Sequence, residues 1–269
     1  METIKQNSQL LKKLDRKTQG IQNFYGYDVL NCYEVSYLDT KGMPQQVQVK
    51  VMYPSSSVLT VDRVSLRNYL DTFRMVMFAS PSEVQKAIQE DLKTLLQCHT
   101  VVSVFPIEGM AYPYTVVEGV FDLEAVVSSR DFNIETYNKD VELLKVDPRH
   151  KSPFYAKSTS LSSLTKSGNK VMNGDLYISI EGKSYPELVS LLQYIASYRN
   201  EAFTEEELVE SIYNDLLTKY EPNSLCVCAK YTRRNGVDVN CVRFSDLGST
   251  EVAINILNKE VPNLKTSRQ

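Results

Sequence analysis

Hydrophobic and polar positions alternate in two runs near the start of the chain. The first run is residues 33–37 (YEVSY), and the second places valine or tyrosine at every other position across residues 47–53. Residues 39–42 (DTKG) lie between them and have the composition of a turn. A period of two is typical of strands with one buried face. The pattern therefore predicts an antiparallel hairpin.

The hairpin is followed by two stretches in which apolar residues recur at helical spacing. The first covers residues 66–73 and the second residues 80–96, which place apolar side chains along one face of each helix. Residues 101–105 and 115–121 are short apolar runs of strand length. The first half thus predicts the order strand, strand, helix, helix, strand, strand.

The same order returns in the second half of the chain. It consists of a strand at residues 176–180, helices at 188–195 and 204–216, and strands at 225–231 and 237–243. The second helix begins with a capping box, Thr204 followed three residues later by Glu207. Asn235-Gly236, between the last two strands, is typical of a tight hairpin turn.

The two halves also match residue by residue. Residues 69–74 (YLDTFR) align with residues 194–199 (YIASYR), and Asp91 aligns with Asp215. We therefore predict an α+β fold of tandem duplicated ββααββ units, with an antiparallel sheet and helices on one face. The expected division is an N-terminal extension (1–31), a first module (32–146), a linker (147–173) and a second module with a C-terminal tail (174–269).

Composition and charge exclude several classes of protein. The chain has 30 Lys+Arg and 33 Asp+Glu, so no basic field exists to attract a nucleic-acid backbone. The apolar runs are too short to span a membrane, and the polar N-terminus does not resemble a signal peptide. We expect a cytoplasmic protein that binds neither membrane nor nucleic acid. The basic cluster at residues 12–17 is expected to be a solvated helix face, with an RNA contact as the alternative.

The five cysteines are expected to be reduced. Cys226 and Cys228 lie two apart on one predicted strand, and Cys241 lies across the hairpin. Three thiolates could hold zinc, but a fourth ligand is missing from the sequence. Ordinary packed thiols and the absence of a metal are the preferred interpretation.

Four segments resemble the two-module form of NADPH-dependent 7-cyano-7-deazaguanine reductase, a nitrile reductase with the tunnelling fold. They are residues 33–44 (YEVSYLDTKGMP), 62–73 (DRVSLRNYLDTF), 210–216 (ESIYNDL) and 231–240 (YTRRNGVDVN). The resemblance implies reduction of a nitrile on the route to queuosine. It also implies a cysteine that adds to the nitrile, a histidine in a Phe-His-Glu motif, and NADPH as hydride donor.

The family's catalytic groups are missing from the matching positions. Asn169 stands nearest to the nucleophile's position, with Thr165 as the alternative, and the Gln-Pro-Asp segment that should follow is absent. The histidine position falls on Thr204 or Glu205, depending on where the gap is placed. We therefore expect no catalytic residues of the family type in this chain.

The family's binding groups are partly retained. The resemblance implies that Glu205 or Glu206 grips the N–H edge of a purine-like base, with Asp62 as a second, shorter carboxylate. It implies that Arg67, Arg233 and Arg234 contact the cofactor. The alternatives are a helix N-terminus that favours carboxylates and solvated hairpin arginines.

Three functions follow. The leading hypothesis is a catalytically silent relative that binds a purine-like or deazapurine-like ring or acts in assembly. The second is an active NADPH-dependent nitrile reductase, with Cys226 or Cys228 as candidate nucleophile, and the third is a structural or interaction protein. No cofactor is certain, and NADPH binds if the family's site survives. Open sheet edges lead us to expect a homo-oligomer, a dimer or larger.

Overall fold

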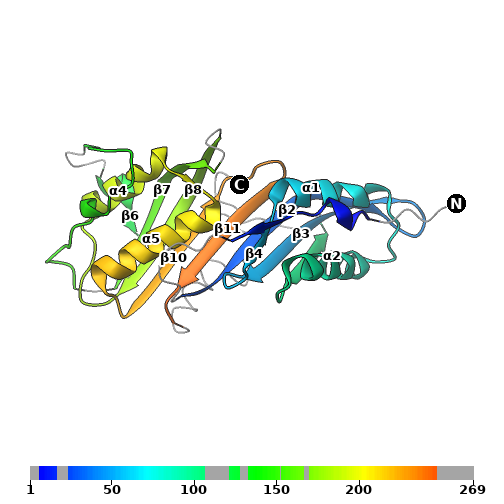
Figure 1. Cartoon of the computed structure of the whole chain (residues 1–269), viewed down its shortest axis with the longest axis horizontal. Coiled ribbons are helices and arrows are strands. Elements are labelled where there is room, and N and C mark those ends of the chain that lie inside the picture. The colour runs from blue at the N-terminus through cyan, green and yellow to red at the C-terminus, as the bar shows by residue number, and fades with distance from the viewer. Residues whose placement is uncertain are drawn as a thin grey trace. The chain divides into compact units, whose positions relative to one another are not determined.

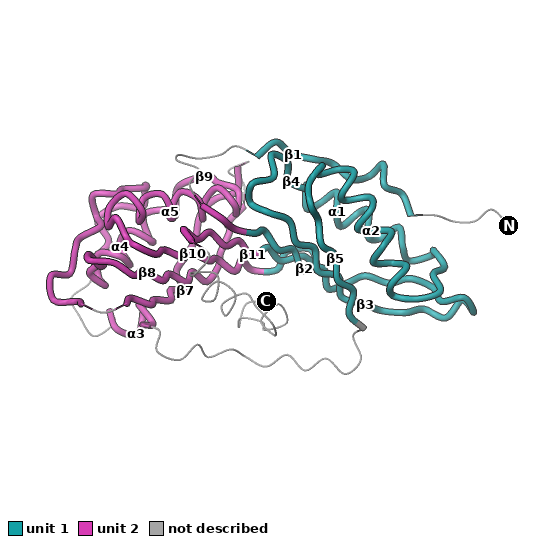
Figure 2. Tube along the Cα trace, turned by 90° about the horizontal axis from the view of Figure 1, so that it is seen from below, with its two compact units in different colours: residues 1–17, 27–112, 233–239 teal, residues 18–26, 113–232, 240–269 magenta. Residues whose placement is uncertain are grey.

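The computed structural model describes residues 6–16, 24–106, 121–127, 133–151, 153–166 and 170–246. The chain divides into two compact units, each described by itself (Figure 2). Unit 1 comprises residues 1–17, 27–112 and 233–239, and unit 2 comprises residues 18–26, 113–232 and 240–269. No helix in the described segments is both long and apolar enough to cross a membrane.

Unit 1 is built on the predicted hairpin and its two helices (Figure 1). Its sheet has the order β5-β3-β2, and all pairs are antiparallel. A separate two-stranded sheet joins β1 to β4. The elements are η1 (Ser8–Leu10), β1 (Lys13–Asp15), β2 (Tyr25–Leu38), β3 (Pro44–Pro54), β4 (Leu59–Val61), α1 (Arg63–Asp71), η2 (Thr72–Met75), α2 (Pro81–Leu96) and β5 (Val101–Pro106).

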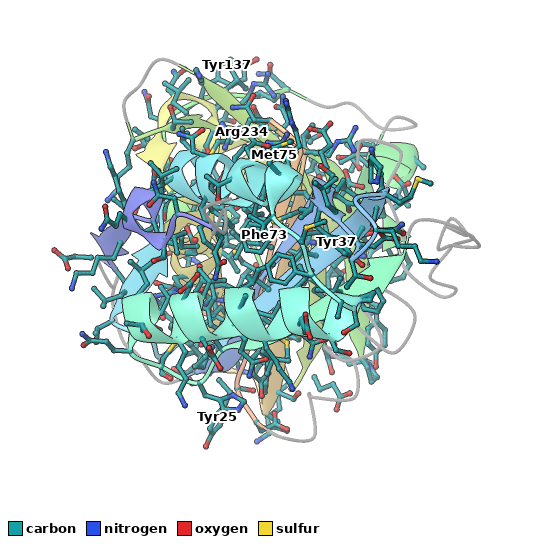
Figure 3. All side chains as sticks on the ribbon, turned by 90° about the vertical axis from the view of Figure 1, so that its right-hand side faces the viewer. Tyr25, Tyr37, Phe73, Met75, Tyr137 and Arg234 are labelled. Carbon is teal, nitrogen blue, oxygen red and sulfur yellow. The ribbon has the colours of Figure 1, made fainter. Side chains whose placement is uncertain are left out.

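The core of unit 1 lies between this sheet and its helices. Val49 and Val51 of β3 are fully buried, as are Leu66 of α1 and Ile88 of α2. Phe73 of η2 lies in the interior with Tyr37, and Met75 ends the same turn (Figure 3). Alternation in the strand and a four-residue period in the helices thus bury one face of each, as the sequence predicts.

Unit 2 has the same plan. Its sheet has the order β11-β10-β8-β7-β6, with β9 beside β7. β6 and β9 pair with β7 in parallel, and the other pairs are antiparallel. The elements are β6 (Phe121–Asp122), α3 (Leu123–Val127), η3 (Val141–Leu143), β7 (Phe154–Thr165), β8 (Val171–Glu181), α4 (Leu188–Ala196), η4 (Ser197–Asn200), β9 (Ala202–Phe203), α5 (Glu205–Tyr220), β10 (Ser224–Tyr231) and β11 (Val237–Phe244), whose first three residues belong to unit 1.

Equivalent hydrogen bonds confirm the internal duplication. Tyr69 donates its hydroxyl to Asp91 Oδ2 at 2.7 Å, and Tyr194 donates to Asp215 Oδ2 at 2.6 Å. The entry to the first helix is repeated as well: Asp62 accepts from the Ser65 amide and Glu187 from the Ser190 amide, both at 2.7 Å. The predicted α+β fold of duplicated units is therefore confirmed.

The repeat extends further toward the N-terminus than the hairpins. The Lys12 amide donates to Ser65 Oγ at 2.9 Å, and the Lys145 amide donates to Ser190 Oγ at 3.1 Å. η1 and η3 precede these lysines in the two halves. Residues 6–12 thus have a structural counterpart in residues 139–145.

Three stretches differ from the sequence interpretation. The predicted linker, residues 147–173, contains all of β7, because small hydroxyl side chains buried in a strand have the composition of a loop. The predicted extension, residues 1–31, contains η1, β1 and the start of β2. Of the strand predicted at residues 115–121, only the last residue is described, in β6; residues 115–120 lie outside the described residues.

The basic cluster near the N-terminus is not a helix face. Lys13 begins strand β1, which pairs with β4, and Lys12 and Lys13 are exposed. Arg16 forms an ion pair with Asp28 in which both side chains are buried. Lys17 lies outside the described residues. The helix prediction was wrong because a three-residue edge strand is too short to show a period.

Candidate functional site

Three acidic residues begin helix α5, and only one of them caps it. Thr204 Oγ1 accepts from the Glu207 amide at 3.2 Å, and Glu207 Oε2 accepts from the Thr204 amide at 3.0 Å. This confirms the predicted capping box. Glu205 and Glu206 are buried, with 2% and 6% of their surface exposed. Neither forms the cap, so the capping interpretation does not account for these two carboxylates.

The end of strand β7 lies directly beside the residues that precede these acids. Thr165 pairs with Phe203 of β9, and Lys166 forms an ion pair with Glu207. Tyr231, at the end of β10, donates its hydroxyl to the Glu205 carbonyl at 3.0 Å. The structure therefore brings Thr165, one predicted nucleophile position, next to the predicted base-binding motif. Asn169, the other position, lies outside the described residues.

The expected imidazole has no replacement at this place. The Thr204 hydroxyl is used by the helix cap. His150 of unit 2 lies among the rings of Phe121, Phe154 and Tyr185, with centroids 4.9–6.2 Å away. A threonine hydroxyl needs an adjacent general base to act as a nucleophile. Of the described residues near Thr165, Lys166 and Glu207 are paired with each other.

Asp62 caps helix α1 in unit 1. Its Oδ1 accepts from the Ser65 amide, and its counterpart in unit 2 is Glu187, the cap of α4. Asp62 and the acidic start of α5 belong to different units. Its role in base binding stays a prediction, with one carboxylate oxygen already used for the cap.

The three predicted cofactor arginines all belong to unit 1. Arg67 binds Asp71 through two nitrogens, at 2.9 and 3.2 Å, and Glu34 Oε2 at 3.0 Å. The β10–β11 turn approaches the same arginine. A Cβ on Gly236 would lie 2.8 Å from Arg67 Nη1 and 2.7 Å from Glu34 Oε2. At φ 76° any other residue would be strained, and its Cβ would displace the ends of these two side chains.

The turn itself confirms the hairpin prediction. Asn235 and Gly236 both have positive φ, 50° and 76°, as a two-residue hairpin loop of this class requires. Arg233 lies over the Tyr33 ring, 5.1 Å from its centroid, and Tyr33 donates to Asp238 Oδ2 at 2.5 Å. Because Arg67 is bound by two carboxylates, a phosphate site here depends on Arg233 and Arg234.

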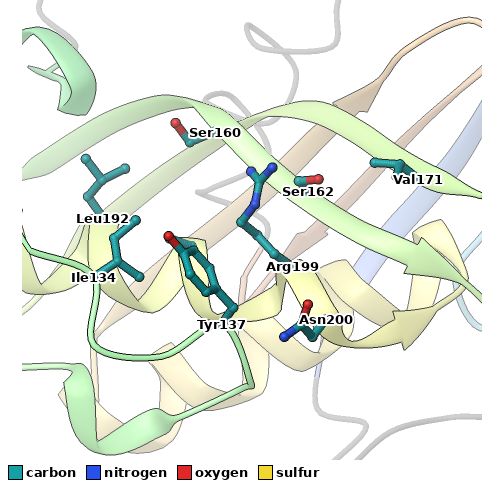
Figure 4. A pocket seen from close by; sticks show the side chains of 9 residues that line it. Ile134, Tyr137, Ser160, Ser162, Val171, Leu192, Arg199 and Asn200 are labelled. Atoms are coloured by element: carbon teal, nitrogen blue, oxygen red, sulfur yellow. The ribbon is translucent and has the colours of Figure 1, made fainter.

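A pocket of about 530 Å³ lies along β7 in unit 2 (Figure 4). We call it the β7 pocket. Ser160 and Ser162 of β7 line one side, and Arg199 and Asn200 of η4 line another. Tyr137 completes the wall, and its carbonyl accepts from the Asn200 amide at 3.0 Å. None of these residues was identified from the sequence, although Arg199 ends the segment that aligns with residues 69–74.

Four of the five cysteines lie in the core. Cys226 and Cys228 pair with Phe244 and Val242, so all four side chains share one face of the sheet and form one apolar cluster with Tyr177. Burial raises the pKa of Cys228 and of Cys32 to about 12, and it raises the pKa of Cys226 as well. A buried thiol is not a nucleophile. The burial of both thiols does not support the alternative in which Cys226 or Cys228 attacks the substrate.

The zinc alternative fails for a geometric reason. Cys241 lies opposite Ala229 and next to Val242 on β11. Successive side chains of a strand point to opposite faces, so Cys241 points away from the face that carries Cys226 and Cys228. The three sulfurs cannot surround one ion.

Thiol labelling tests this placement. At about pH 8 we expect iodoacetamide to modify Cys98, which is half-buried, and to spare the four buried cysteines of the folded protein. All five react after denaturation in guanidinium. Intact-mass spectrometry reads the number of adducts, and the Cys98→Ser variant should show none when folded. Rapid native labelling of Cys226 or Cys228 would restore the nucleophile hypothesis.

Comparison with known proteins gives a consistent family. A family model described as "Nitrile reductase, 7-cyano-7-deazaguanine-reductase N-term" matches residues 5–104, and one described as "QueF-like protein" matches residues 174–247. The chain is 30% identical over 260 residues to the NADPH-dependent 7-cyano-7-deazaguanine reductase of Psychrobacter arcticus, covering 93% of this chain and 91% of that protein. Proteins of the same name from Hahella chejuensis (30% over 235 residues, 85% and 83% covered) and Coxiella burnetii (31% over 242 residues, 86% and 83% covered) are similar.

Proposed function

Because this chain belongs to the family of NADPH-dependent 7-cyano-7-deazaguanine reductases, we propose that it binds a purine-like or deazapurine-like ring but does not reduce it. The name of the relatives implies two properties, recognition of the ring and its reduction, and we propose only the first for this chain. Each depends on different side chains of the chain.

The placement of the cysteines carries the second half of the proposal. All five lie within the described residues, four are buried, and the fifth, Cys98, belongs to unit 1 at the end of α2. Reduction through a covalent thioimide needs a thiolate within reach of the nitrile carbon. Of the described residues beside the acidic start of α5, Thr165, Lys166 and Tyr231 supply no sulfur.

The buried carboxylates support ring binding. A carboxylate accepts two N–H bonds from the edge of a guanine-like ring, and such charge-assisted bonds are about twice as strong as neutral ones. Glu205 and Glu206 are buried at a helix N-terminus, where the helix dipole favours negative charge. Glu207 fulfils the capping role, so the cap does not explain why the first two acids are buried.

The cofactor residues fit only in part. NADPH supplies a hydride when bound, and its phosphates need cationic partners. Arg233 and Arg234, on the β10–β11 turn, are the residues that would hold a phosphate. Arg67 is neutralised by Glu34 and Asp71, so its predicted contact with the cofactor would require a change of partners.

Calorimetry combined with a turnover assay tests the proposal. We expect micromolar binding of 7-cyano-7-deazaguanine, reduced at least tenfold in the Glu205→Gln/Glu206→Gln variant, and no decrease in NADPH absorbance with the wild-type protein. Glu142→Gln, an exposed acid on η3, is the matched control and should bind as the wild type does. NADPH consumption above the rate without enzyme would refute silence and establish the reductase alternative.

The third hypothesis, a purely structural or interaction protein, makes the opposite prediction in the same experiment. Absence of heat with this base, guanine and a pterin would favour it. We also propose that the chain self-associates, because β5 and β6 end the two sheets in the described part of the chain and edge strands favour pairing.

A further inference from the structure

The duplication gives the chain two pockets at matching places. The β7 pocket of unit 2 has a volume of about 530 Å³. A second pocket, of about 690 Å³, lies along β2 in unit 1, and we call it the β2 pocket. Both volumes are in the range of small-molecule sites.

The pockets are built from the same elements at the same positions. β2 and β7 each contain a register shift, which ends at Val35 in β2 and at Leu161 in β7. The next residue lines the pocket in each case: Ser36 in unit 1 and Ser162 in unit 2.

The other wall comes from the short 3-10 helix after the first long helix. The third residue of η2 is Arg74, and the third residue of η4 is Arg199. Each arginine lines the pocket of its own unit. The serine and the arginine are therefore structural equivalents in the two halves.

The remaining lining has diverged. Glu34 and Met75 of the β2 pocket correspond to Ser160 and Asn200 of the β7 pocket. Against this change, the arginine and the serine are the same in both. Because the other lining residues differ between the two pockets, the retained arginine and serine point to a function that these two residues share.

The shared arginine is not explained by folding. Arg74 and Arg199 are exposed, and within the described segments of the chain no carboxylate pairs with either of them. A guanidinium at the wall of a polar pocket, with no protein anion to neutralise it, suits an oxyanion, which it can bind through two nitrogens.

We propose that each half of the chain carries an oxyanion pocket that binds a phosphate group of a small molecule, through Arg74 and Ser36 in unit 1 and through Arg199 and Ser162 in unit 2. None of these four residues is part of the proposed ring binding by Glu205 and Glu206, and the sites do not depend on it. The β2 pocket shares Arg67 and Glu34 with the approach of the β10–β11 turn.

The two pockets differ in charge. Arg199 is the sole charged residue among the described residues that line the β7 pocket. The β2 pocket also contains Arg67, Glu34 and Asp71, so its four charges sum to zero. The β7 pocket therefore binds an anion more tightly than the β2 pocket does.

Titration calorimetry with pyrophosphate in a phosphate-free, low-salt buffer tests the proposal. We expect two sites per chain with affinities at least threefold apart. Arg199→Ala removes the tighter site and Arg74→Ala removes the weaker one. Arg149→Ala, an exposed arginine outside both pockets, is the matched control and keeps both sites.

Each departure from this pattern decides against the proposal. Fewer than two sites in the wild type, or a pocket variant that binds as many pyrophosphate molecules as the wild type, overturns it. Malonate separates the sources of the oxyanion: tighter binding of this dicarboxylate than of pyrophosphate overturns the assignment to phosphate. Because both arginines are exposed, the variants keep the wild-type melting temperature, and a lowered one would show instead that these arginines serve the fold.

Discussion

Replacing Glu210 with alanine is expected to destabilise the protein by about 3–5 kcal/mol, because it leaves a buried guanidinium without its counter-ion. Arg243 has no exposed side-chain surface, and Glu210 is 1% exposed. Glu210 Oε1 accepts from Arg243 Nη2 at 2.8 Å and from Nε at 3.2 Å. Urea unfolding followed by circular dichroism measures the loss as a lowered midpoint.

The double variant Glu210→Leu/Arg243→Met separates the pair from its packing. Removing both charges together relieves the desolvation cost of each, so we expect a stability within about 1–2 kcal/mol of the wild type. The Phe24 ring, 5.5 Å from the Arg243 guanidinium, would then contact a methionine. A single Glu210→Ala variant that loses less than about 1 kcal/mol would show that Arg243 finds another partner or reaches water.

Local periodicity predicted most of the fold. Alternation identified β2 and β3, helical spacing identified α1, α2, α4 and α5, and Asn235-Gly236 identified the last hairpin. These features are determined by residues close together in sequence, whose preferences agree with the final structure. The duplication was also visible, because Tyr69, Asp91 and their counterparts keep the same spacing and make the same hydrogen bond.

The strands that the sequence did not predict are determined by contacts between residues that lie far apart in sequence. Strand β7 contains a run of serine and threonine that is indistinguishable from a loop until β8 and α4 cover it. Strand β1 consists of three exposed residues, and its pairing with β4 has no local signal. Both strands depend on partners far away in sequence, which a periodicity cannot show.

The candidate site was predicted only in part, because some of its features are local in sequence and others are tertiary contacts. The spacing of Thr204 and Glu207 defines the capping box, so the sequence alone could separate Glu207 from Glu205 and Glu206. The pairing of Arg67 with Glu34 and its approach to Gly236 are tertiary contacts. The two pockets become visible only when the repeat is placed on the strands, because Ser36 and Ser162 lie in segments that show no alignment by themselves.

The duplication supplies a matched control for the tyrosine–aspartate hydrogen bond that the two halves share. Asp215→Ala is expected to destabilise the protein by about 3 kcal/mol, against about 1 kcal/mol for the equivalent Asp91→Ala. Asp91 accepts one hydroxyl, from Tyr69. Asp215 accepts hydroxyls from Tyr194 and Tyr198, at 2.6 and 3.0 Å, and pairs with Lys139 at 2.8 Å.

The difference arises because unit 2 has polar groups where unit 1 has apolar ones. Tyr198 occupies the place of Phe73, and Ser211, which bonds Tyr198 at 3.0 Å and Lys139 at 2.9 Å, occupies that of Ala87. Without Asp215, two buried hydroxyls and a partly buried ammonium lose an acceptor, and each buried loss costs about 1–3 kcal/mol.

Tyr198→Phe restores the phenylalanine that unit 1 has at this place. Combined with Asp215→Ala in a double-mutant cycle, it should show a coupling free energy of about 1 kcal/mol, measured by urea unfolding. Equal losses for Asp215→Ala and Asp91→Ala would mean that the network adds nothing to the single hydrogen bond that both halves share. A larger loss for Asp215→Ala would mean that the contacts with Tyr198 of η4 and with Lys139 stabilise the fold as well.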